Sequence, residues 1–506
     1  MSSRSATAAL AAMSTLALAG CGGGGGDSPP ARDVSPAAGA AGARASIRAP
    51  DGDWPQFGYD AERSGTGPAR TGISAGNART LRRRAVRLAG TADLAPIQLH
   101  AVRVRRRVRD VVILTTTYGR TIAIDPGTGA KLWQFVPSDI RSYEGSFRIT
   151  NAGPVADPGR QYVYAASPDG FIHKLAVATG RQVWATGVTR DATHEKLASP
   201  LAISGNSVIA TTGGYIGDAP PYQGHVVLID RANGAVRHVW NSLCSDRHQL
   251  LVPHTCAASD SAIWSRAGPV LEPSTGRILI ATGNAPFNGR TNWGDSVLEL
   301  TPDASGLLQN FTPTEQAHLN ATDADLGSTS PALLPDPGGP PLAVQGGKDG
   351  RLKLLNLNKL NGSGGAGRHL GGELQSLPVP GGGQMFTAPA VWVHGGQSYL
   401  FVADDSGTSA YVLHAGPKPR LSVAWQRGSP GTSPVLAGGL LFVYDELSGH
   451  LNVLHPLSGR GAASLPAGSG HWQSPIVVGG RVILGTGNGN AHKKSGELLI
   501  YHLRRR

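Results

Sequence analysis

The sequence predicts an all-β fold, an eight-bladed β-propeller whose blades are four-stranded antiparallel sheets. The first observation is composition: 70 glycines, 36 prolines and only 16% charged residues among 506 fit many short strands joined by turns. The second is a motif, GRTIAIDPGTGAKLW from Gly119, that recurs along the chain. The third is that two further strand-sized segments precede each recurrence. Four strands per unit, repeated in this way, are the signature of propeller blades.

Each unit has an upstream and a downstream half. The upstream half is a small residue with proline, an apolar strand, a turn and a second apolar strand, as in SPIVVGGRVILGTG. The downstream half opens on a glycine, and these glycines are Gly119, Gly170, Gly224, Gly294, Gly350, Gly407, Gly449 and Gly496. Four units end in a tryptophan: Trp133, Trp184, Trp240 and Trp425. We interpret these rings as structural residues that dock neighbouring blades, rather than as cofactor platforms.

The N-terminal region has the features of an export signal. Residues 1–20 contain Arg4 and then a small-residue apolar run that is too short to span a bilayer, so they are interpreted as a signal peptide. The run ends in LAGC, which resembles the lipobox of bacterial lipoproteins and implies lipidation of Cys21; a plain signal peptide with a chance cysteine is the alternative. Residues 21–50 have the composition of a Gly/Pro/Ala tether, and residues 51–506 are expected to form one propeller.

This organisation predicts an exported protein that is lipid-anchored to a bacterial membrane, on its periplasmic or outer cell-surface side. The sequence does not indicate which membrane carries the anchor. Once Cys21 is assigned to lipid, Cys244 and Cys256 remain as an even pair within one loop. An oxidising compartment favours a disulfide between them, which would stabilise the fold by roughly 3 kcal/mol. Two free thiols are the alternative.

The last unit lacks a strand, which raises the question of how the ring closes. Only three arginines follow Leu503, so the eighth blade has three strands of its own and an open edge. The segment 84–90, RAVRLAG, alternates apolar residues and has no blade of its own. We predict that it is the outermost strand of the last blade, antiparallel to residues 497–503. Deletion through Leu81 is then expected to leave a folded ring, and deletion through Gly90 to destabilise it.

The repeat resembles that of the pyrroloquinoline-quinone (PQQ) repeat β-propellers. The Asp-x-x-Thr-Gly-x-x-x-Trp pattern, the opening DWPQFGYDAERSG, and TGNAPFN followed by GGKDG support the resemblance, which extends from about Trp54 to the C-terminus. That superfamily includes calcium- and PQQ-dependent alcohol dehydrogenases, and also non-enzymatic propellers such as the lipoprotein of the outer-membrane β-barrel assembly machine. The resemblance implies that Asn284 matches a metal-ligand asparagine and that Lys348 matches the cation beside the quinone oxygens. PQQ and calcium are therefore possible cofactors, and neither is assigned.

Other positions depart from the dehydrogenase pattern. No two cysteines are adjacent, so the disulfide lid over the quinone is absent, and Arg266 falls where the floor tryptophan is expected, with Trp264 close by. Gly214 and Tyr215 stand where the family has a glutamate ligand.

The family's catalytic base falls near Asn320. The nearest acids, Asp323 and Asp325, are the only candidates for a catalytic role, with structural turn residues as the alternative. These departures favour a lipid-anchored envelope propeller with a degenerate quinone site that binds or scaffolds without catalysis. A PQQ- and calcium-dependent alcohol or sugar dehydrogenase is the alternative.

The net charge of +12 comes largely from three arginine runs, TLRRRAVR, VRVRRRVRD and the terminal RRR. A solvated basic rim explains them without a partner, whereas an anionic envelope polymer or lipid headgroups would explain them with one. The expected partners are the membrane, through the anchor, and an envelope protein, a glycan or a small ligand. Nucleic acid is not expected, since no aromatic-interleaved basic motif is present. A monomer is expected.

Overall fold

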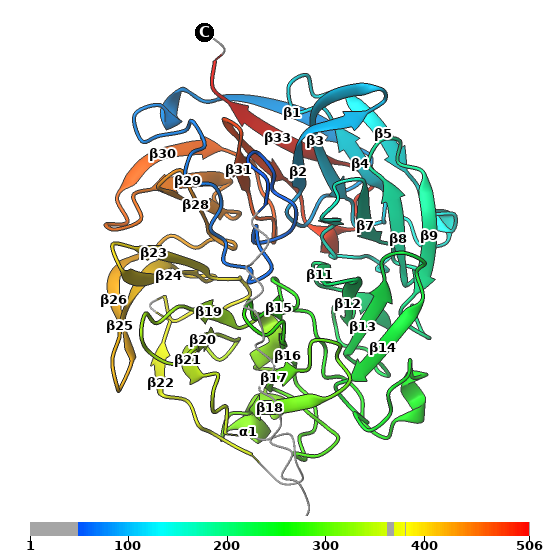
Figure 1. Cartoon of the computed structure of the whole chain (residues 1–506), viewed down its shortest axis with the longest axis vertical. Coiled ribbons are helices and arrows are strands. Elements are labelled where there is room, and N and C mark those ends of the chain that lie inside the picture. The colour runs from blue at the N-terminus through cyan, green and yellow to red at the C-terminus, as the bar shows by residue number, and fades with distance from the viewer. Residues whose placement is uncertain (1–48, 362–368, 380, 505–506) are drawn as a thin grey trace, which may run out of the picture. The chain divides into compact units, whose positions relative to one another are not determined.

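The computed structural model confirms the eight-bladed β-propeller, with eight antiparallel sheets arranged in a ring (Figure 1). It describes residues 49–361, 369–379 and 381–504, which belong to one compact unit. The signal peptide, Cys21 and all but the last two residues of the tether lie outside the described residues, so these predictions remain untested.

In each blade the first strand lies nearest the axis of the ring, and the following strands lie progressively closer to its rim. Blade 1 contains β2 (Ile97–Val104), β3 (Arg107–Thr115), β4 (Thr121–Ile124) and β5 (Lys131–Phe135). Blade 2 contains β6 (Val155–Ala156), β7 (Tyr162–Ala166), β8 (Phe171–Ala176) and β9 (Gln182–Gly187). Blade 3 contains β11 (Ala202–Ser204), β12 (Ser207–Gly214), β13 (His225–Asp230) and β14 (Val236–Asn241), and β10 (Glu195–Leu197) adds to the far end of β12. Blade 4 contains β15 (Val270–Leu271), β16 (Ile278–Ala281), β17 (Val297–Leu300) and β18 (Leu307–Phe311).

The second half of the ring repeats this order. Blade 5 contains β19 (Ala332–Leu334), β20 (Leu342–Gln345), β21 (Arg351–Asn356) and β22 (Gln375–Pro378). Blade 6 contains β23 (Ala390–His394), β24 (Gln397–Ala403), β25 (Thr408–His414) and β26 (Arg420–Arg427). Blade 7 contains β27 (Val435–Ala437), β28 (Leu440–Asp445), β29 (His450–Leu454) and β30 (Gly461–Pro466). Blade 8 contains β31 (Ile476–Val478), β32 (Arg481–Gly485), β33 (Gly496–His502) and β1 (Arg82–Leu88).

Short helices occur only in the connections of the described chain. They are η1 (Ala78–Thr80), η2 (Ile140–Ser142), η3 (Pro253–Thr255), α1 (Gln316–Ala321), η4 (Leu326–Ser328) and η5 (Gly489–Ala491). None of the helices within the described residues is long and apolar enough to cross a membrane.

The up-and-down order of strands gives the ring two different ends. The first-to-second and third-to-fourth turns of every blade lie at one end, called here the hairpin end. The second-to-third turns and the connections between blades lie at the other, called here the cavity end.

The tryptophan and the Thr-Gly turn of the repeat meet across neighbouring blades. Trp133 of β5 donates its Nε1–H to the carbonyl of Val177 in blade 2 at 2.8 Å. A Cβ on Gly180 would lie 2.5 Å from the Trp133 ring, and Gly180 also has a φ of +74°. Only glycine satisfies both conditions. The same contact joins Trp184 to Gly234, and Trp425 to Gly459.

Trp240 is docked differently. It is 1% exposed and packs against apolar residues of blade 4, among them Leu271 and Ile278. All four tryptophans therefore lie at blade-to-blade contacts in the structure, away from the channel.

The ring closes as predicted. β1 pairs antiparallel with β33 in one register, from Arg82 opposite His502 to Leu88 opposite Gly496, so that blade 8 gains its fourth strand (Figure 1). The strand begins two residues earlier than expected and ends at Leu88, where Gly90 adopts a φ of +133°. Leu88 is 6% exposed and belongs to the same apolar cluster as Ile500.

The described residues that precede β1 are part of the folded ring. Trp54 is 1% exposed and exchanges backbone hydrogen bonds with Gln98 of β2. Arg63 is 3% exposed and donates to three carbonyls, those of Phe57 (2.8 Å), Leu201 (2.9 Å) and Pro269 (3.3 Å). The segment thus ties blades 3 and 4 together. The expectation that deletion through Leu81 leaves the ring folded assumed that this segment makes no contacts with the blades, and that assumption is wrong.

The predicted disulfide is present between Cys244 and Cys256, whose Cα atoms are 6.2 Å apart. It lies in the connection from β14 to β15 and packs with Leu243 and Ala285.

Candidate functional site

A cavity of about 500 Å³ opens at the cavity end of the ring. Two kinds of position line it. Residues just before the innermost strands supply Trp264, Arg266, Phe386 and Trp472, and residues that follow the second strands supply Tyr215, Asn284 and Lys348. Several blades therefore point one loop each at the same space, as propellers commonly do.

Three aromatic rings form one wall of this cavity. The centroid of Trp264 lies 6.1 Å from that of Phe386 and 6.0 Å from that of Trp472, and the Phe386 and Trp472 centroids are 6.4 Å apart with planes 26° from parallel. They come from three different blade connections. Such a surface suits a flat apolar or aromatic body.

Arg266 lies against this wall. Its guanidinium carbon is 3.5 Å from the Trp472 centroid and 5.5 Å from that of Trp264, distances at which cations bind aromatic faces. The residue is 2% exposed, and its Nε and Nη1 have no hydrogen-bond partner among the described residues. Burial lowers the pKa of the guanidinium to about 9, so it stays charged at neutral pH. A buried cation with unused donors is costly unless an anion completes it.

Lys196 is a second buried cation of the cavity. Its side chain belongs to β10, is 6% exposed, and forms no ion pair within the part of the chain that the structure describes. Burial, together with the positive charge of Arg266, lowers the pKa of the ammonium to about 7. Asp218 also lines the cavity, but it accepts the hydroxyl of Tyr222 at 3.0 Å and pairs with neither cation.

The residues singled out by the sequence are brought together beside this wall. Lys348 Nζ lies 2.6 Å from Asp325 Oδ2 and 2.9 Å from Asp323 Oδ1. The other oxygen of Asp325 accepts the backbone N–H of Asn284 at 2.7 Å. Although burial lowers the pKa of Lys348, the two carboxylates outweigh it and raise the pKa. Both acids are therefore occupied by a cation of the chain itself.

Asp93 supports the wall from beneath. Its carboxylate is buried and accepts from His471 Nδ1 (2.7 Å), from the backbone N–H groups of Trp472 (3.2 Å) and Gly489 (2.9 Å), and from Asn151 Nδ2 (3.2 Å). His471 in turn stacks on Trp472 with centroids 3.6 Å apart. Asp93 thereby fixes the ring on which Arg266 lies, and its negative charge partly opposes the effect of burial on the pKa of that arginine.

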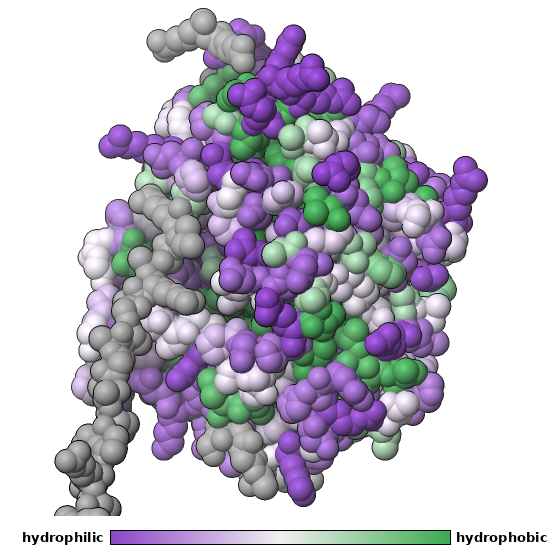
Figure 2. Space-filling view, turned by 45° about the vertical axis from the view of Figure 1, so that its right-hand side comes forward, coloured by the Kyte–Doolittle hydropathy of each residue, from purple (hydrophilic) through white to green (hydrophobic). Residues whose placement is uncertain are grey.

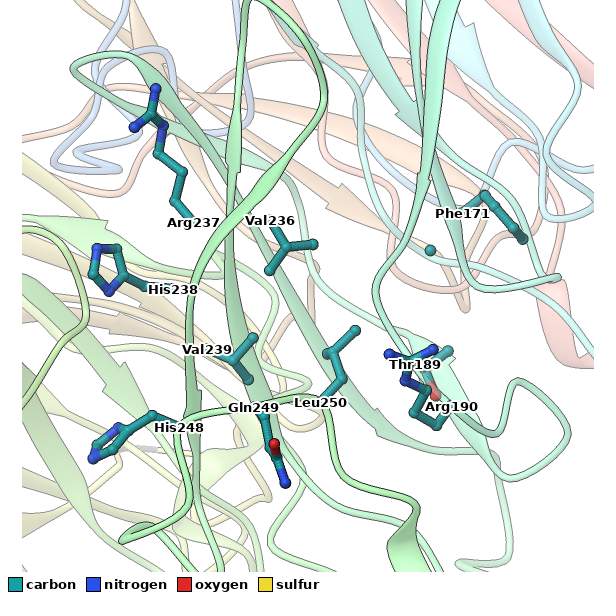
Figure 3. A pocket seen from close by; sticks show the side chains of 11 residues that line it. Phe171, Thr189, Arg190, Val236, Arg237, His238, Val239, His248, Gln249 and Leu250 are labelled. Carbon is teal, nitrogen blue, oxygen red and sulfur yellow. The ribbon is translucent and has the colours of Figure 1, made fainter.

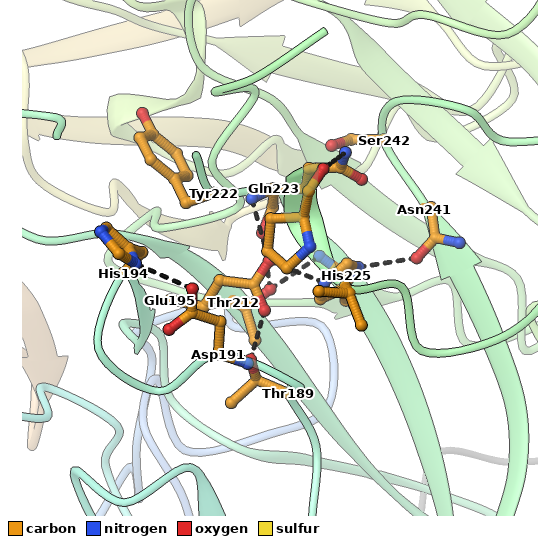
Figure 4. A network of polar contacts seen from close by, with 12 residues as sticks. Thr189, Asp191, His194, Glu195, Thr212, Tyr222, Gln223, His225, Asn241 and Ser242 are labelled. Atoms are coloured by element: carbon orange, nitrogen blue, oxygen red, sulfur yellow. Dashed lines mark hydrogen bonds and ion pairs between the residues drawn. The ribbon is translucent and has the colours of Figure 1, made fainter. Parts of the chain in front are cut away.

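A buried polar network holds the strand that carries Lys196 (Figure 4). Glu195 accepts from His225 Nε2 at 2.9 Å and from the backbone N–H of Gln223 at 3.1 Å. His225 Nδ1 faces the Asn241 oxygen at 2.6 Å, an orientation fixed because Asn241 Nδ2 donates to Gln249 O. Both ring nitrogens thus face acceptors; burial lowers the pKa of His225, but Glu195 outweighs it and raises the pKa. The Glu195–His225 ion pair anchors β10. Because Glu195 is bound to His225, it does not pair with the neighbouring Lys196.

Other hollows lack these features. A hollow of about 590 Å³ on the rim between blades 2 and 3 is lined by Phe171, Val236, Arg237 and Leu250 (Figure 3). Of its two arginines, Arg237 is already bound to Asp230, and Arg190 is exposed to solvent rather than buried. A hollow of about 680 Å³ at the hairpin end contains Arg160, which is bound to Asp53. Of these hollows, the central cavity is therefore the one with a buried cation whose hydrogen-bond donors lack partners among the described residues.

The sequence is similar to one protein family and to several known proteins. The family model of the outer membrane protein assembly factor BamB matches residues 72–279. The quinoprotein alcohol dehydrogenase PedH of Pseudomonas putida is 28% identical over 236 residues, 40% of this chain and 37% of that one. The quinohemoprotein alcohol dehydrogenase of Comamonas testosteroni is 22% identical over 45% of this chain and 34% of its own. These matches support the assignment of the chain to the PQQ-repeat β-propeller superfamily.

Solved structures agree on the fold of this PQQ-repeat propeller. The quinohemoprotein alcohol dehydrogenase of Comamonas testosteroni superposes with a TM-score of 0.65 at 18% identity, over 92% of this chain and 84% of that one. BamB of Moraxella catarrhalis superposes with a TM-score of 0.52 at 14% identity, over 84% of this chain and 98% of that one. These similarities establish the fold alone. The matched region covers only about a third of the length of the curated relatives.

Several residues of this cavity differ from those expected around a calcium-bound quinone. No group of three or more His, Cys, Asp or Glu side chains in the described ranges could hold a metal ion. Asp323 and Asp325 are taken by Lys348, and Tyr215, at the expected glutamate position, donates its hydroxyl to Ala192 O at 3.0 Å. The Cys244–Cys256 disulfide does not line the cavity.

Sequence reasoning identified Asn284, Lys348, Asp323 and Asp325, but it missed Lys196, Phe386 and Trp472. A signal for the last two was present. Arg266, Phe386 and Trp472 each stand two residues before the small residue–proline step that opens an innermost strand, in RAGP, FTAP and WQSP. Aligning the units on that step, rather than on the glycine, would have placed these three residues at one equivalent position. The other five units have Asp93, Asn151, Leu197, Ser328 and Gly431 there.

Proposed function

We propose that this protein is an exported, lipid-anchored propeller of the bacterial cell envelope, and that its central cavity binds a small anion without a metal ion and without catalysis. The observation that supports this best is Arg266: it is buried on Trp472, it is charged, and two of its nitrogens have no partner in the described structure. An anionic group placed beside Trp472 would satisfy them.

The remaining lining narrows the ligand class. The Trp264–Phe386–Trp472 wall favours a flat aromatic body, and Arg266 with Lys196 favours a carboxylate on it. Aromatic stacking and charge-assisted hydrogen bonds would then act on opposite parts of one molecule. An aromatic carboxylate is the simplest compound that meets both demands.

The dehydrogenase alternative rests on the relatives that carry that name. It requires a metal site and a free base, and in this chain the candidate acids Asp323 and Asp325 are held by Lys348. Both carboxylates are thus paired with one ammonium, although burial raises the pKa of Asp325.

The proposal is tested by titrating naphthalene-2-carboxylate into the purified protein in EDTA, with heat and tryptophan fluorescence as readouts. Naphthalene-2-carboxamide, a neutral molecule of the same shape, is the matched probe. We expect the carboxylate to bind and the amide to bind much more weakly. Arg266→Gln should weaken carboxylate binding by about 2 kcal/mol, roughly 30-fold, because it removes a charge-assisted hydrogen bond.

Arg290→Gln is the control, because Arg290 is exposed and lies outside the cavity. It should leave both affinities unchanged. Equal binding of carboxylate and amide, or an Arg266→Gln variant with full affinity, would show that the cavity does not select anions.

A further inference from the structure

Arginines gather at the hairpin end where blade 1 meets blade 8. Those from β1 and from the β2–β3 hairpin are Arg82, Arg83, Arg84, Arg103, Arg105, Arg106 and Arg107, and we call them the arginine face. The β4–β5 turn joins the two groups, because Arg84 Nη1 donates to Gly127 O at 2.5 Å and Arg109 pairs with Asp125 at 3.1 Å. Figure 2 shows hydrophilic side chains gathered at the upper edge, where Figure 1 places β1 and β33.

The positive charge of the arginine face is not neutralised by the chain. None of its seven members forms an ion pair with an acid of the described residues, and all except Arg84 are exposed. The acids nearest to them are engaged elsewhere: Asp110 binds Arg481 at 3.0 Å and His100 at 2.6 Å, and Asp125 binds Arg109. The face is therefore available to an external anion.

The hairpin turn favours a role for the side chains over one for the backbone. Arg105 and Arg106 have φ values of +48° and +67°, the two left-handed positions of a tight turn. Asn-Gly is the pair that adopts this conformation with least strain. Arginine at both positions therefore strains the backbone, and we interpret its positive charge as the reason for its presence in the turn.

The chain from the expected anchor enters the ring at this same end. The described chain starts at Ala49, 28 residues after Cys21 (49 − 21 = 28). Ala49 and Asp53 line the hollow at the hairpin end together with Asp157 and Gly205, which lie in first-to-second turns. Asp53 binds Arg160 at 2.8 Å, and Arg160 lines the same shallow hollow as Arg103.

We propose that the arginine face binds anionic phospholipid headgroups of the membrane that carries the anchor, so that the central cavity opens away from that membrane. The orientation rests on the proposed lipid anchor, whereas the binding rests on the arginines alone. Clusters of four to eight basic residues beside a membrane attachment attract anionic lipid in this way. The attraction falls within a Debye length, so it weakens as salt is added.

The test uses full-length protein with Cys21→Ser, so that no lipid is attached, and its co-sedimentation with phosphatidylglycerol or phosphatidylcholine vesicles. The test variant combines Arg103→Gln, Arg105→Asn, Arg106→Gly and Arg107→Gln, which removes four charges and relaxes the turn. The control variant removes four exposed arginines of the cavity end, Arg87, Arg141, Arg190 and Arg290, by replacement with Gln. Both variants have the same net charge, and the N-terminal segment is identical in all proteins.

We expect the parent and the control to partition alike onto phosphatidylglycerol vesicles, and the test variant to partition at least tenfold less, with binding lost in high salt. Equal loss in both variants would reduce the effect to net charge and overturn the proposal. Unchanged binding by the test variant would overturn it too. If the protein binds duplex DNA as tightly as it binds the vesicles, the arginine face binds any polyanion, and the proposal of a lipid partner is overturned. Because the cavity ligand is absent from this assay, its outcome is independent of the proposed function.

Discussion

At the residue scale, Arg266 most clearly separates this chain from a quinone enzyme. It takes the position at which a floor tryptophan was expected, and its guanidinium covers the face of Trp472. The positive charge of Arg266 also acts on Lys196, because two cations that share a buried space disfavour each other. Of these two cations, Arg266 stays charged at neutral pH, whereas the charge of Lys196 depends on pH.

This dependence gives a prediction for ligand binding. The pKa of Lys196 is lowered to about 7, so its ammonium is charged at pH 6 and mostly neutral at pH 8.5. An anion prefers the charged form, and the affinity for naphthalene-2-carboxylate should therefore fall as the pH rises through 7, by at most tenfold per unit. Lys196→Met should bind weakly at both values and lose the dependence. A wild-type affinity that is constant from pH 6 to 8.5 would exclude a role for Lys196.

The candidate site was only partly predictable at this scale. Asn284 and Lys348 stand out because their motifs, TGNAPFN and GGKDG, are local. Lys196 on β10 has no local motif, and the shared position of Phe386 and Trp472 before a small residue–proline step does not show that they meet. They meet only because the ring brings the ends of distant blades together. The engagement of Asp323 and Asp325 by Lys348 likewise depends on side-chain contacts that no motif specifies.

At the element scale, β1 is the strand on which the ring depends. The sequence allowed its prediction because the last unit lacks a strand and 84–90 alternates apolar residues, two facts that need no tertiary information. The burial of Trp54 and Arg63 could not be predicted in this way, since their partners at Gln98 and Leu201 lie far along the chain. A segment without strand periodicity was interpreted as dispensable, although it fills the hairpin end of the ring.

The register of the closure predicts a specific cross-link. Arg87 of β1 lies opposite Glu497 of β33, and both are exposed. In a Cys21→Ser background, Arg87→Cys with Glu497→Cys should form an intramolecular disulfide, because Cα atoms of paired antiparallel residues lie within its range. Closing so long a loop should raise the free energy of unfolding by about 6 kcal/mol in the chain-entropy model. Ala85→Cys with Glu497→Cys, two residues out of register, is the control. Equal cross-linking of the two pairs would contradict the observed register.

At the scale of the whole molecule, the sequence determined the fold because eight similar units constrain one another. A single unit would have been an ordinary hairpin pair, whereas repetition with Thr-Gly and Trp at fixed offsets left a propeller as the economical solution. The glycines of the repeat, such as Gly180, are explained by the Trp rings that cover them. The same regularity hides function, because the motif that repeats is the one that builds the ring.

The anchor is a prediction at this scale. Replacement of Cys21 by Ser should release the protein from the membrane fraction or leave it with an uncleaved signal peptide, because the thiol that would accept the lipid is gone. Fractionation and mass spectrometry of the N-terminal peptide measure both results. If the variant still carries diacylglycerol, the lipobox interpretation is wrong.

The most direct test of the central claim, that this cavity binds without catalysing, is an alcohol oxidation assay. The purified protein is supplied with PQQ and calcium, and dye reduction is followed with simple primary alcohols, beside an active quinoprotein alcohol dehydrogenase as a positive control. We predict background rates, since the candidate acids are held by Lys348 and the described residues offer no metal cluster. Robust turnover that requires both additions and disappears in Asn284→Ala would contradict the account and establish the protein as a dehydrogenase.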